Sequence, residues 1–180
     1  MFHGTTILAV RKNRTIAVGC DGRVTQGSIS MKENEVKMRS LKEGTIITAF
    51  SGTVSDGHIV LDMIKDGLDL NEYKKGKIYD FAVGIGKKLR KEKDNRGLSA
   101  FFILADYKGV AYLDGDGCVL ECDNNVAQVG TGGQLAMGAA KALLEYTELS
   151  PSEIIKISIG IAGDSNVFCN KHITVMSPKK

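Results

Sequence analysis

The sequence predicts an α+β domain in four layers, an αββα sandwich with two stacked sheets and a helix pair outside each. The expected elements come in blocks along the chain: strands, two helices, strands, two helices and strands. Segregated blocks are typical of layered α+β domains, whereas parallel-sheet proteins alternate strand and helix. Several expected strands are apolar almost throughout and therefore need cover on both faces. At 180 residues, the chain fits one domain.

The first strands are expected in the N-terminal quarter. Thr5–Lys12 and Thr15–Asp21 indicate two strands joined by a tight turn. Shorter strand-like pieces follow near Ser28–Met31 and Val36–Leu41, and the β-branched run Thr45–Ser51 predicts a buried strand.

Two helices are expected next. The first starts at Thr53 and continues to about Leu68, with apolar residues at helical spacing. In the second, apolar residues recur from Ile78 to Leu89 at the spacing of one helix face. The lysines of that helix are expected to face water.

The second half repeats this order. Leu98–Ala105 and Gly109–Leu113 predict a hairpin, and Val119–Cys122 and Val126–Val129 are expected to continue its meander. A helix should begin after Thr131-Gly132-Gly133. Ser150-Pro151-Ser152-Glu153 has the pattern of a capping box and should start a helix that runs to about Ala162. Val167–Met176 is expected to supply two last short strands.

Composition excludes several classes of protein. A net charge of +3, without a basic stripe among aromatics, gives no indication of nucleic-acid binding. No apolar run approaches the roughly 20 residues that span a bilayer. The spacing of Cys118 and Cys122 lacks a second ligand pair, so zinc is not predicted. Cys20 and Cys169 complete a set of four thiols that we expect to be reduced, in a cytoplasmic protein.

The Gly4–Thr5 junction is the first candidate for chemistry. We interpret Met1–Gly4 as a leader removed on maturation and residues 5–180 as the working domain. An N-terminal threonine holds a hydroxyl nucleophile and an amine base in one residue, which is a known solution to covalent catalysis.

Asp21 and Lys37 could support that threonine. In a simple hairpin register, Asp21 lies near the Thr5 end of its partner strand, although a carboxylate before glycine is more often a turn residue. Lys37 would be a fixed cation that keeps an α-amine, with a reference pKa of about 7.7–8.0, unprotonated near neutral pH. Alone, this lysine would be an ordinary surface residue.

Acyl transfer also needs N–H donors for an oxyanion. The segment Ala49-Phe50-Ser51-Gly52, at the end of a buried strand, can supply them. Gly130-Thr131-Gly132-Gly133, before a helix, is a second such place. His3, His58 and His172 are in unrelated elements and suggest no catalytic triad.

Taken together, these segments resemble the HslV family, the peptidase subunits of bacterial ATP-dependent HslUV proteases and relatives of proteasome β subunits. The resemblance runs from Phe2 to about Asn170. It is carried by HGTTILAVR, GCDG, MKENEVK, TAFSGT, VGTGGQLAMGAAKALLEYTELSPSEI and IAGD. It implies an N-terminal nucleophile hydrolase fold and a dodecamer of two stacked hexameric rings that enclose the active sites.

The resemblance also implies roles for individual residues. Thr5 matches the nucleophile, Asp21 and Lys37 the acid and lysine beside it, and Thr131 and Asp164 a hydroxyl and a carboxylate of the same site. Backbone carbonyls of Gly163, Asn166 and Cys169 match a site for Na⁺ or Mg²⁺. Ala49 and Thr131 stand where the family usually has glycine and serine, and the arginine-rich pattern around Arg90–Gly97 is altered.

The main functional hypothesis is hydrolysis of peptide bonds in unfolded proteins by Thr5, with the Ala49 N–H stabilising the oxyanion. No organic cofactor is expected. A hexameric AAA+ unfoldase of the HslU type should deliver substrate and use the ATP. Two alternatives stay open: a non-catalytic or unprocessed ring subunit, which Ala49 suggests, and an N-terminal nucleophile amidase that acts on small amides.

Overall fold

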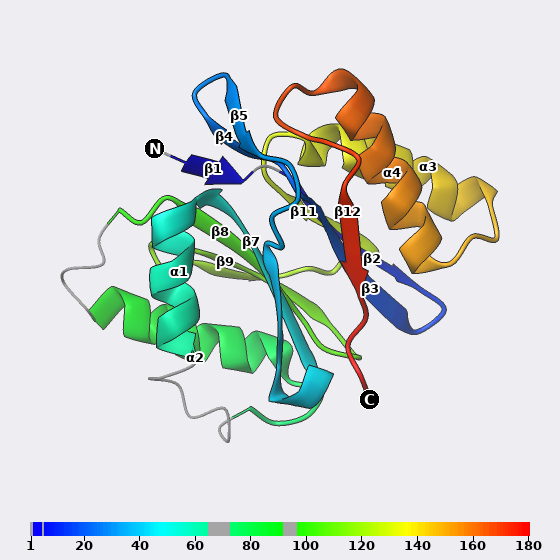
Figure 1. The fold of residues 1–180 in the computed structure, drawn as a ribbon. Coiled ribbons are helices and arrows are strands. Elements are labelled where there is room, and N and C mark those ends of the chain that lie inside the picture. Colours follow the sequence, from blue (N-terminus) through cyan, green and yellow to red (C-terminus); the bar gives the residue numbers. More distant parts are fainter. Residues whose placement is uncertain (1, 5, 65–72, 92–96) are drawn as a thin grey trace.

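A computed structural model describes residues 2–4, 6–64, 73–91 and 97–180. It confirms the predicted four layers, with α1 and α2 outside one sheet and α3 and α4 outside the other (Figure 1). The helices are α1 (Val54–Asp62), α2 (Ile78–Lys91), α3 (Gly133–Tyr146) and α4 (Pro151–Ser165), with a 3₁₀ turn η1 at Lys42–Gly44. The strands are β1 (Phe2–Gly4), β2 (Ile7–Lys12), β3 (Thr15–Asp21), β4 (Val24–Gln26), β5 (Ile29–Lys32), β6 (Met38–Leu41), β7 (Ile46–Thr53), β8 (Ala100–Ala105), β9 (Val110–Asp114), β10 (Val119–Glu121), β11 (Val126–Val129) and β12 (Ile173–Met176).

The two sheets differ in size. The eight-stranded sheet has the order β10-β9-β8-β7-β1-β4-β5, and β6 also pairs with β7. Since β8 occupies one edge of β7, both β6 and β1 lie along its other edge. The four-stranded sheet has the order β11-β2-β3-β12. Among the described residues, no helix is long and apolar enough to cross a membrane.

Three apolar layers hold the sandwich together. One fills the space between the eight-stranded sheet and its helices around Phe102, and a second lies between the sheets around Ile103. The third lies between the four-stranded sheet and α3 and α4, around Ile159. Alternate residues of β8 therefore face different layers, and both faces of this strand are covered from Phe102 to Ala105, as its apolar sequence predicted, whereas Phe101 is exposed.

The β2–β3 hairpin has the simple register expected from the sequence. Asn13 and Arg14 form its turn with φ of 50° and 62°, values that suit the twist of a two-residue hairpin loop. Ile7 pairs with Cys20, and the Asp21 N–H lies 3.3 Å from the Thr6 carbonyl oxygen. Asp21 is thereby brought to the N-terminal end of β2.

Some elements depart from expectation. β11 does not continue the β8–β10 meander but pairs with β2 in the other sheet. Residues 167–172 form a loop, so the C-terminal segment contributes only β12 as a strand. Helix α4 has the predicted capping box at Ser150 but continues to Ser165. Leu68, at the expected end of the first helix, lies outside the described residues.

Candidate active site

Residues 2–4 form a strand inside the larger sheet, which the sequence did not predict. β1 lies between β4 and β7, with Gly4 opposite Val24 on one side and Gly52 on the other. The next strand, β2, belongs to the second sheet, so the chain passes from one sheet to the other between Gly4 and Ile7. We call the position between β4 and β7 the strand slot. Thr5, the candidate nucleophile, lies outside the described residues, between two described neighbours.

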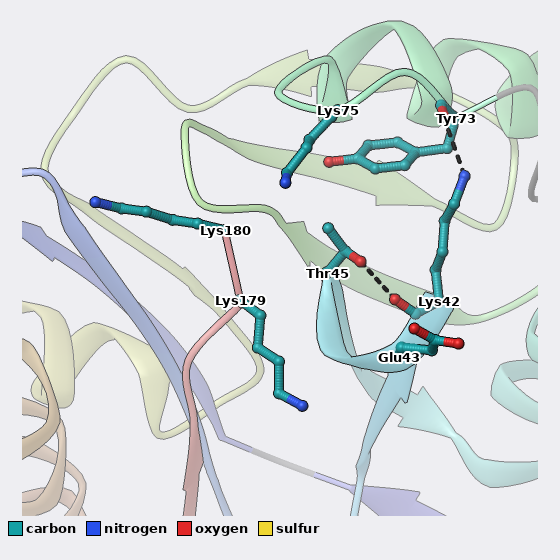
Figure 2. A pocket seen from close by; sticks show the side chains of 7 residues that line it. All are labelled: Lys42, Glu43, Thr45, Tyr73, Lys75, Lys179 and Lys180. Carbon is teal, nitrogen blue, oxygen red and sulfur yellow. Dashed lines mark hydrogen bonds between the residues drawn. The ribbon is translucent and has the colours of Figure 1, made fainter.

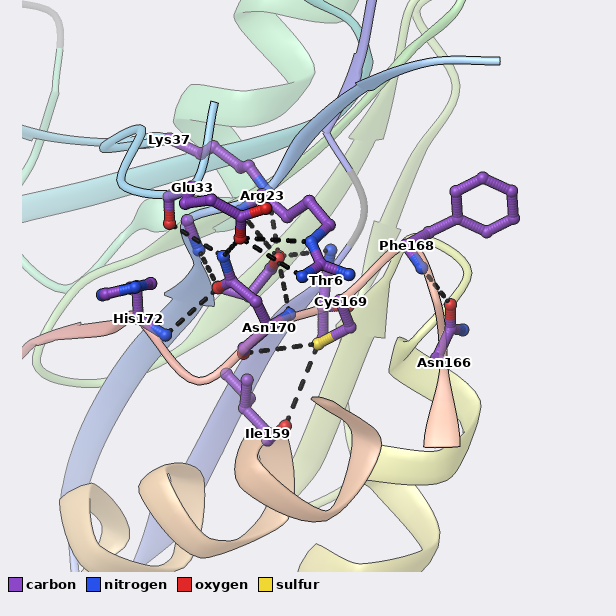
Figure 3. A network of polar contacts seen from close by, with 12 residues as sticks. Thr6, Arg23, Glu33, Lys37, Ile159, Asn166, Phe168, Cys169, Asn170 and His172 are labelled. Atoms are coloured by element: carbon purple, nitrogen blue, oxygen red, sulfur yellow. Dashed lines mark hydrogen bonds and ion pairs between the residues drawn. The ribbon is translucent and has the colours of Figure 1, made fainter. Parts of the chain in front are cut away.

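A buried ion pair lies beside this crossing. Lys37 Nζ is 2.8 Å from Asp21 Oδ1, and the side chains are 2% and 0% exposed. The same Asp21 oxygen accepts the Thr6 N–H at 3.1 Å. The other oxygen accepts the N–H groups of Arg23 at 2.9 Å and Asn170 at 3.3 Å (Figure 3). Buried charges are tolerated only with such partners, so these bonds are what allow the pair to be enclosed.

The structure brings together Asp21 and Lys37, the two residues predicted to support Thr5. Asp21 links the Lys37 ammonium to the backbone of Thr6, the residue directly after the candidate nucleophile. A fixed positive charge near an amine favours the neutral form of that amine. The arrangement can therefore supply the electrostatic environment that an amine base requires.

Two cysteines also border this region, but they are not alternative nucleophiles. Burial raises the pKa of the Cys20 and Cys169 thiols to about 11, so both stay protonated near neutral pH. Cys169 Sγ lies 3.8 Å from the Asn170 carbonyl oxygen. All four cysteines of the chain are free thiols. The described residues contain no cluster of His, Cys, Asp and Glu side chains that could hold a metal ion.

The glycine turn before α3, Gly130–Gly133, lies against Thr6. A Cβ added to Gly132 would lie 2.2 Å from Thr6 Oγ1, so only glycine allows this approach. Thr131, the expected hydroxyl residue, is the preceding residue of the turn and is exposed. The turn therefore brings the Gly132 backbone, rather than the Thr131 hydroxyl, next to Thr6.

Ala49, the expected oxyanion donor, lies in a strand that is paired on both sides. It lies within β7 between Met38 of β6 and Ile103 of β8, and its methyl group belongs to the apolar layer between the sheets. Gly52 is better placed as an N–H donor because it faces Gly4, whose carbonyl belongs to the Gly4–Thr5 bond. Its φ of 115° and the nearby Ser99 carbonyl oxygen, 2.2 Å from an added Cβ, both require glycine. Within the predicted donor segment Ala49–Gly52, the glycine at its end was therefore the residue in the sequence that indicated this position.

Comparisons with known proteins agree with the fold. The model for proteasome subunits matches residues 1–176. The chain belongs to the proteasome subunit family. It is 36% identical over 177 residues to the ATP-dependent protease subunit HslV of Caldicellulosiruptor saccharolyticus, covering 98% of this chain and 99% of the relative.

Solved structures show the same architecture. HslV from Trypanosoma brucei superimposes with a TM-score of 0.86 at 27% identity, covering 98% of this chain and all of the other. BPH from Thiobacillus denitrificans, solved in complex with epoxomicin, gives a TM-score of 0.73 at 19% identity, covering 98% and 100% of the two chains. At 19% identity, the second match shows similarity of fold only. This chain is thus a homologue of the proteasome-type peptidase subunit HslV.

Asp164, which the family resemblance assigned to the site, is not part of the buried network. It is exposed on the last turn of α4 and forms an ion pair with Lys171, each side chain being 61% exposed. The reason is helical geometry: the neighbouring Ala162 faces the core, and Asp164 is turned toward solvent.

The expected cation ligands lie where α4 ends. Gly163 is in the last turn of α4, whose carbonyls lack partners within the helix. The Asn166 carbonyl oxygen accepts the Cys169 N–H at 3.0 Å and has a second lone pair. The loop also folds back on the helix, because a Cβ added to Gly163 would lie 3.0 Å from the Asn170 carbonyl carbon. These carbonyls fit a hard cation chemically.

A lysine-lined pocket of about 460 Å³ lies at the other end of β6 (Figure 2). Lys42, Lys75, Lys179 and Lys180 line it together with Glu43, Thr45 and Tyr73. All four lysines are exposed, and the four residues of β6 lie between Lys37 and Lys42, a span of about 17 Å along an extended strand. The pocket is therefore distinct from the candidate active site.

Proposed function

We propose that this chain is a threonine endopeptidase that hydrolyses peptide bonds of unfolded polypeptides, with Thr5 as nucleophile. The observation that carries the proposal is β1 in the strand slot. Here an extended peptide pairs with strands on both sides, and the bond after its last residue is the Gly4–Thr5 bond. Recognition by strand addition reads the main chain, so the slot suits polypeptides of many sequences.

The proposed reaction uses the groups around the crossing. The Thr5 hydroxyl transfers its proton to the Thr5 α-amine and attacks the substrate carbonyl. The Gly52 N–H stabilises the oxyanion, and the peptide C–N bond then breaks as the protonated α-amine gives its proton to the leaving amine. Water hydrolyses the acyl-ester that remains, which releases the second product and restores the Thr5 hydroxyl. Lys37 favours the neutral amine, and Asp21 holds Lys37 at 2.8 Å. Since the Ala49 methyl is in the core, it does not reach the strand slot, and the observation that suggested a non-catalytic subunit loses its force.

Cleavage of the Gly4–Thr5 bond is part of the proposal. While the leader is attached, Thr5 has no free amine, and β1 fills the strand slot. Removal of residues 1–4 would create the amine and empty the slot in one step.

Replacement of Thr5 tests this function. Thr5→Ala is expected to lower cleavage of a fluorogenic peptide by at least about 10³-fold, because it removes the hydroxyl nucleophile. Thr15→Ala, at an exposed threonine on the far end of the same hairpin, is the matched control and should keep wild-type activity. Full activity in correctly assembled Thr5→Ala protein would overturn the proposal.

We further propose assembly into two stacked hexameric rings and feeding by a hexameric AAA+ unfoldase of the HslU type. Exposed apolar side chains on α4, Ile157 and Ile161 at 41% and 47%, lie one turn apart and support burial against another copy. Native mass measurement should give a dodecamer, and unfoldase with ATP should accelerate degradation of a folded substrate. A monomer that the unfoldase leaves unaffected would contradict this assembly.

A cation held by the carbonyls of Gly163, Asn166 and Cys169 is the last part of the proposal. The ion would fix the loop that leads to Asn170. Thermal unfolding tests this cation site: the melting temperature should be higher in NaCl or MgCl₂ than in choline chloride at equal ionic strength. Equal melting temperatures in these salts would argue against the site.

A further inference from the structure

One side chain beside Asp21 has every hydrogen-bonding position filled. Asn170 is 6% exposed. Its Oδ1 accepts the N–H groups of Gly22 and His172, both at 3.1 Å. Its Nδ2 donates to the Glu33 carbonyl oxygen at 2.8 Å and to Glu33 Oε2 at 2.6 Å (Figure 3). A side-chain amide has two donors and two acceptor lone pairs, so nothing remains unused.

These bonds join three distant parts of the chain. Asn170 follows α4, Gly22 follows β3, and Glu33 follows β5. Their packing is close, because a Cβ added to Gly22 would lie 2.5 Å from the Glu33 carbonyl oxygen. The Arg23 guanidinium closes the arrangement through Nε and Nη2, at 3.3 and 3.2 Å from Glu33 Oε2. We call Gly22, Arg23, Glu33 and Asn170 the Asn170 clamp.

The clamp controls one side of Asp21. Both N–H groups on Asp21 Oδ2 come from clamp residues, Arg23 at 2.9 Å and Asn170 at 3.3 Å. The opposite oxygen, Oδ1, faces Lys37 and the Thr6 N–H. A carboxylate held at one oxygen has a fixed second oxygen, so the clamp determines where the Lys37 partner lies.

We propose that Asn170, supported by Glu33, is a positioning residue for the peptidase reaction and acts through Asp21 and Lys37. This inference rests on the proposed function. Asn170 touches neither the strand slot nor the Gly4–Thr5 bond in any described contact. Its loss should therefore affect the chemical step more than substrate binding, since displacement of a supporting group by a fraction of an ångström is enough to slow catalysis.

Asn170→Asp is the first test variant because it conserves shape. It keeps an acceptor for Gly22 and His172 but sets a carboxylate against the Glu33 carboxylate, where the present bond is 2.6 Å. We expect kcat for a short fluorogenic peptide to fall about 10- to 100-fold, with KM within about two-fold of wild type. The double variant Asn170→Asp/Glu33→Gln restores a donor opposite an acceptor and should recover about ten-fold of the lost kcat.

Two further proteins complete the test. Glu33→Gln alone keeps the shape of this half-exposed side chain and should lower kcat about three-fold at unchanged KM. If Asn170→Asp does not fold, this variant tests the positioning role by itself. Lys171→Ala, at the exposed neighbouring residue, is the control and should match wild type. Amide hydrogen exchange at Gly22 and Arg23 should be faster in Asn170→Asp and slower again in the double variant.

The outcomes separate the two proposals. A Thr5-dependent wild type with reduced kcat in Asn170→Asp and recovery in the double variant supports the positioning role. Unchanged kcat in the folded variants, a loss confined to KM, or a double variant that regains its melting temperature without kcat overturns that role and leaves the proposed function intact. If wild-type activity does not depend on Thr5, the proposed function fails first, and the positioning role with it.

Discussion

Two acid–lysine pairs lie near the end of α4, and their surroundings are opposite. Asp21 and Lys37 are enclosed, at 0% and 2% exposure, and Asp21 accepts three backbone N–H groups besides the lysine. Asp164 and Lys171 are each 61% exposed. The first pair combines charge with burial beside Thr6, whereas water screens the second. Only the enclosed pair can exert a strong field on a neighbouring group, so proximity in sequence to the site does not make Asp164 part of it.

The largest effect should follow from breaking the enclosed pair. Lys37→Met leaves the Asp21 charge buried without its partner, which typically costs about 3–5 kcal/mol. It also removes the cation that favours a neutral amine, so kcat should fall by at least about 10²-fold. Urea unfolding and peptidase kinetics measure the two effects. Wild-type stability together with wild-type kcat would show that the pair is not what distinguishes this region.

The same contrast between enclosed and open positions applies to two glycines with positive φ. Gly52→Ala brings a methyl group 2.2 Å from the Ser99 carbonyl oxygen at a φ of 115°. We expect a loss of about 2 kcal/mol or more in stability and at least about 10-fold in kcat. Gly27 has a φ of 59°, and a Cβ added there would meet nothing within 4 Å. Gly27→Ala should therefore lower the free energy of unfolding by only about 1 kcal/mol and leave kcat unchanged. Equal effects on kcat would remove Gly52 from the proposed oxyanion site.

A smaller effect is expected from the acid that supports Asn170. Hydrogen bonds from Ser30 and Asn170 lower the pKa of Glu33 from 4.5 to about 2. A lowered pKa stabilises the folded state above pH 4.5, and this contribution disappears as the pH falls to 2. The melting temperature of Glu33→Gln should therefore lie a few degrees below wild type at pH 6 and approach it as the pH falls from 4.5 to 2. A constant difference would contradict this origin.

The smallest effect is expected at the exposed pair. Asp164→Asn removes an ion pair of a kind worth about 0–1 kcal/mol and should leave peptidase kinetics within about two-fold of wild type. Its melting temperature and kcat should be measured beside those of Lys37→Met. A 10-fold loss of kcat in Asp164→Asn would restore this acid to the site.

The sequence predicted those parts of the site that local pattern determines. Strand alternation placed Asp21 at the end of β3, and the hairpin register brought it to Thr6. The Ser150 capping box likewise follows from four adjacent residues. Asn170 could not be found this way, because its partners Gly22 and Glu33 lie 148 and 137 residues away.

The sequence also could not show which residue of a segment has the proposed role. Ala49 and Gly52 lie in one strand, and only the strand pairing shows which of them faces Gly4. Strand β1 could not be predicted because three residues carry no periodicity of their own. It exists through pairing with β4 and β7.

The intact mass of the purified chain tests the central claim most directly. Wild type should begin at Thr5, having lost residues 1–4, and should gain one adduct on Thr5 when treated with a peptide epoxyketone. Thr5→Ala should keep its leader and gain none. A wild-type chain that retains residues 1–4 and gains no adduct would contradict the account of a self-processed threonine peptidase.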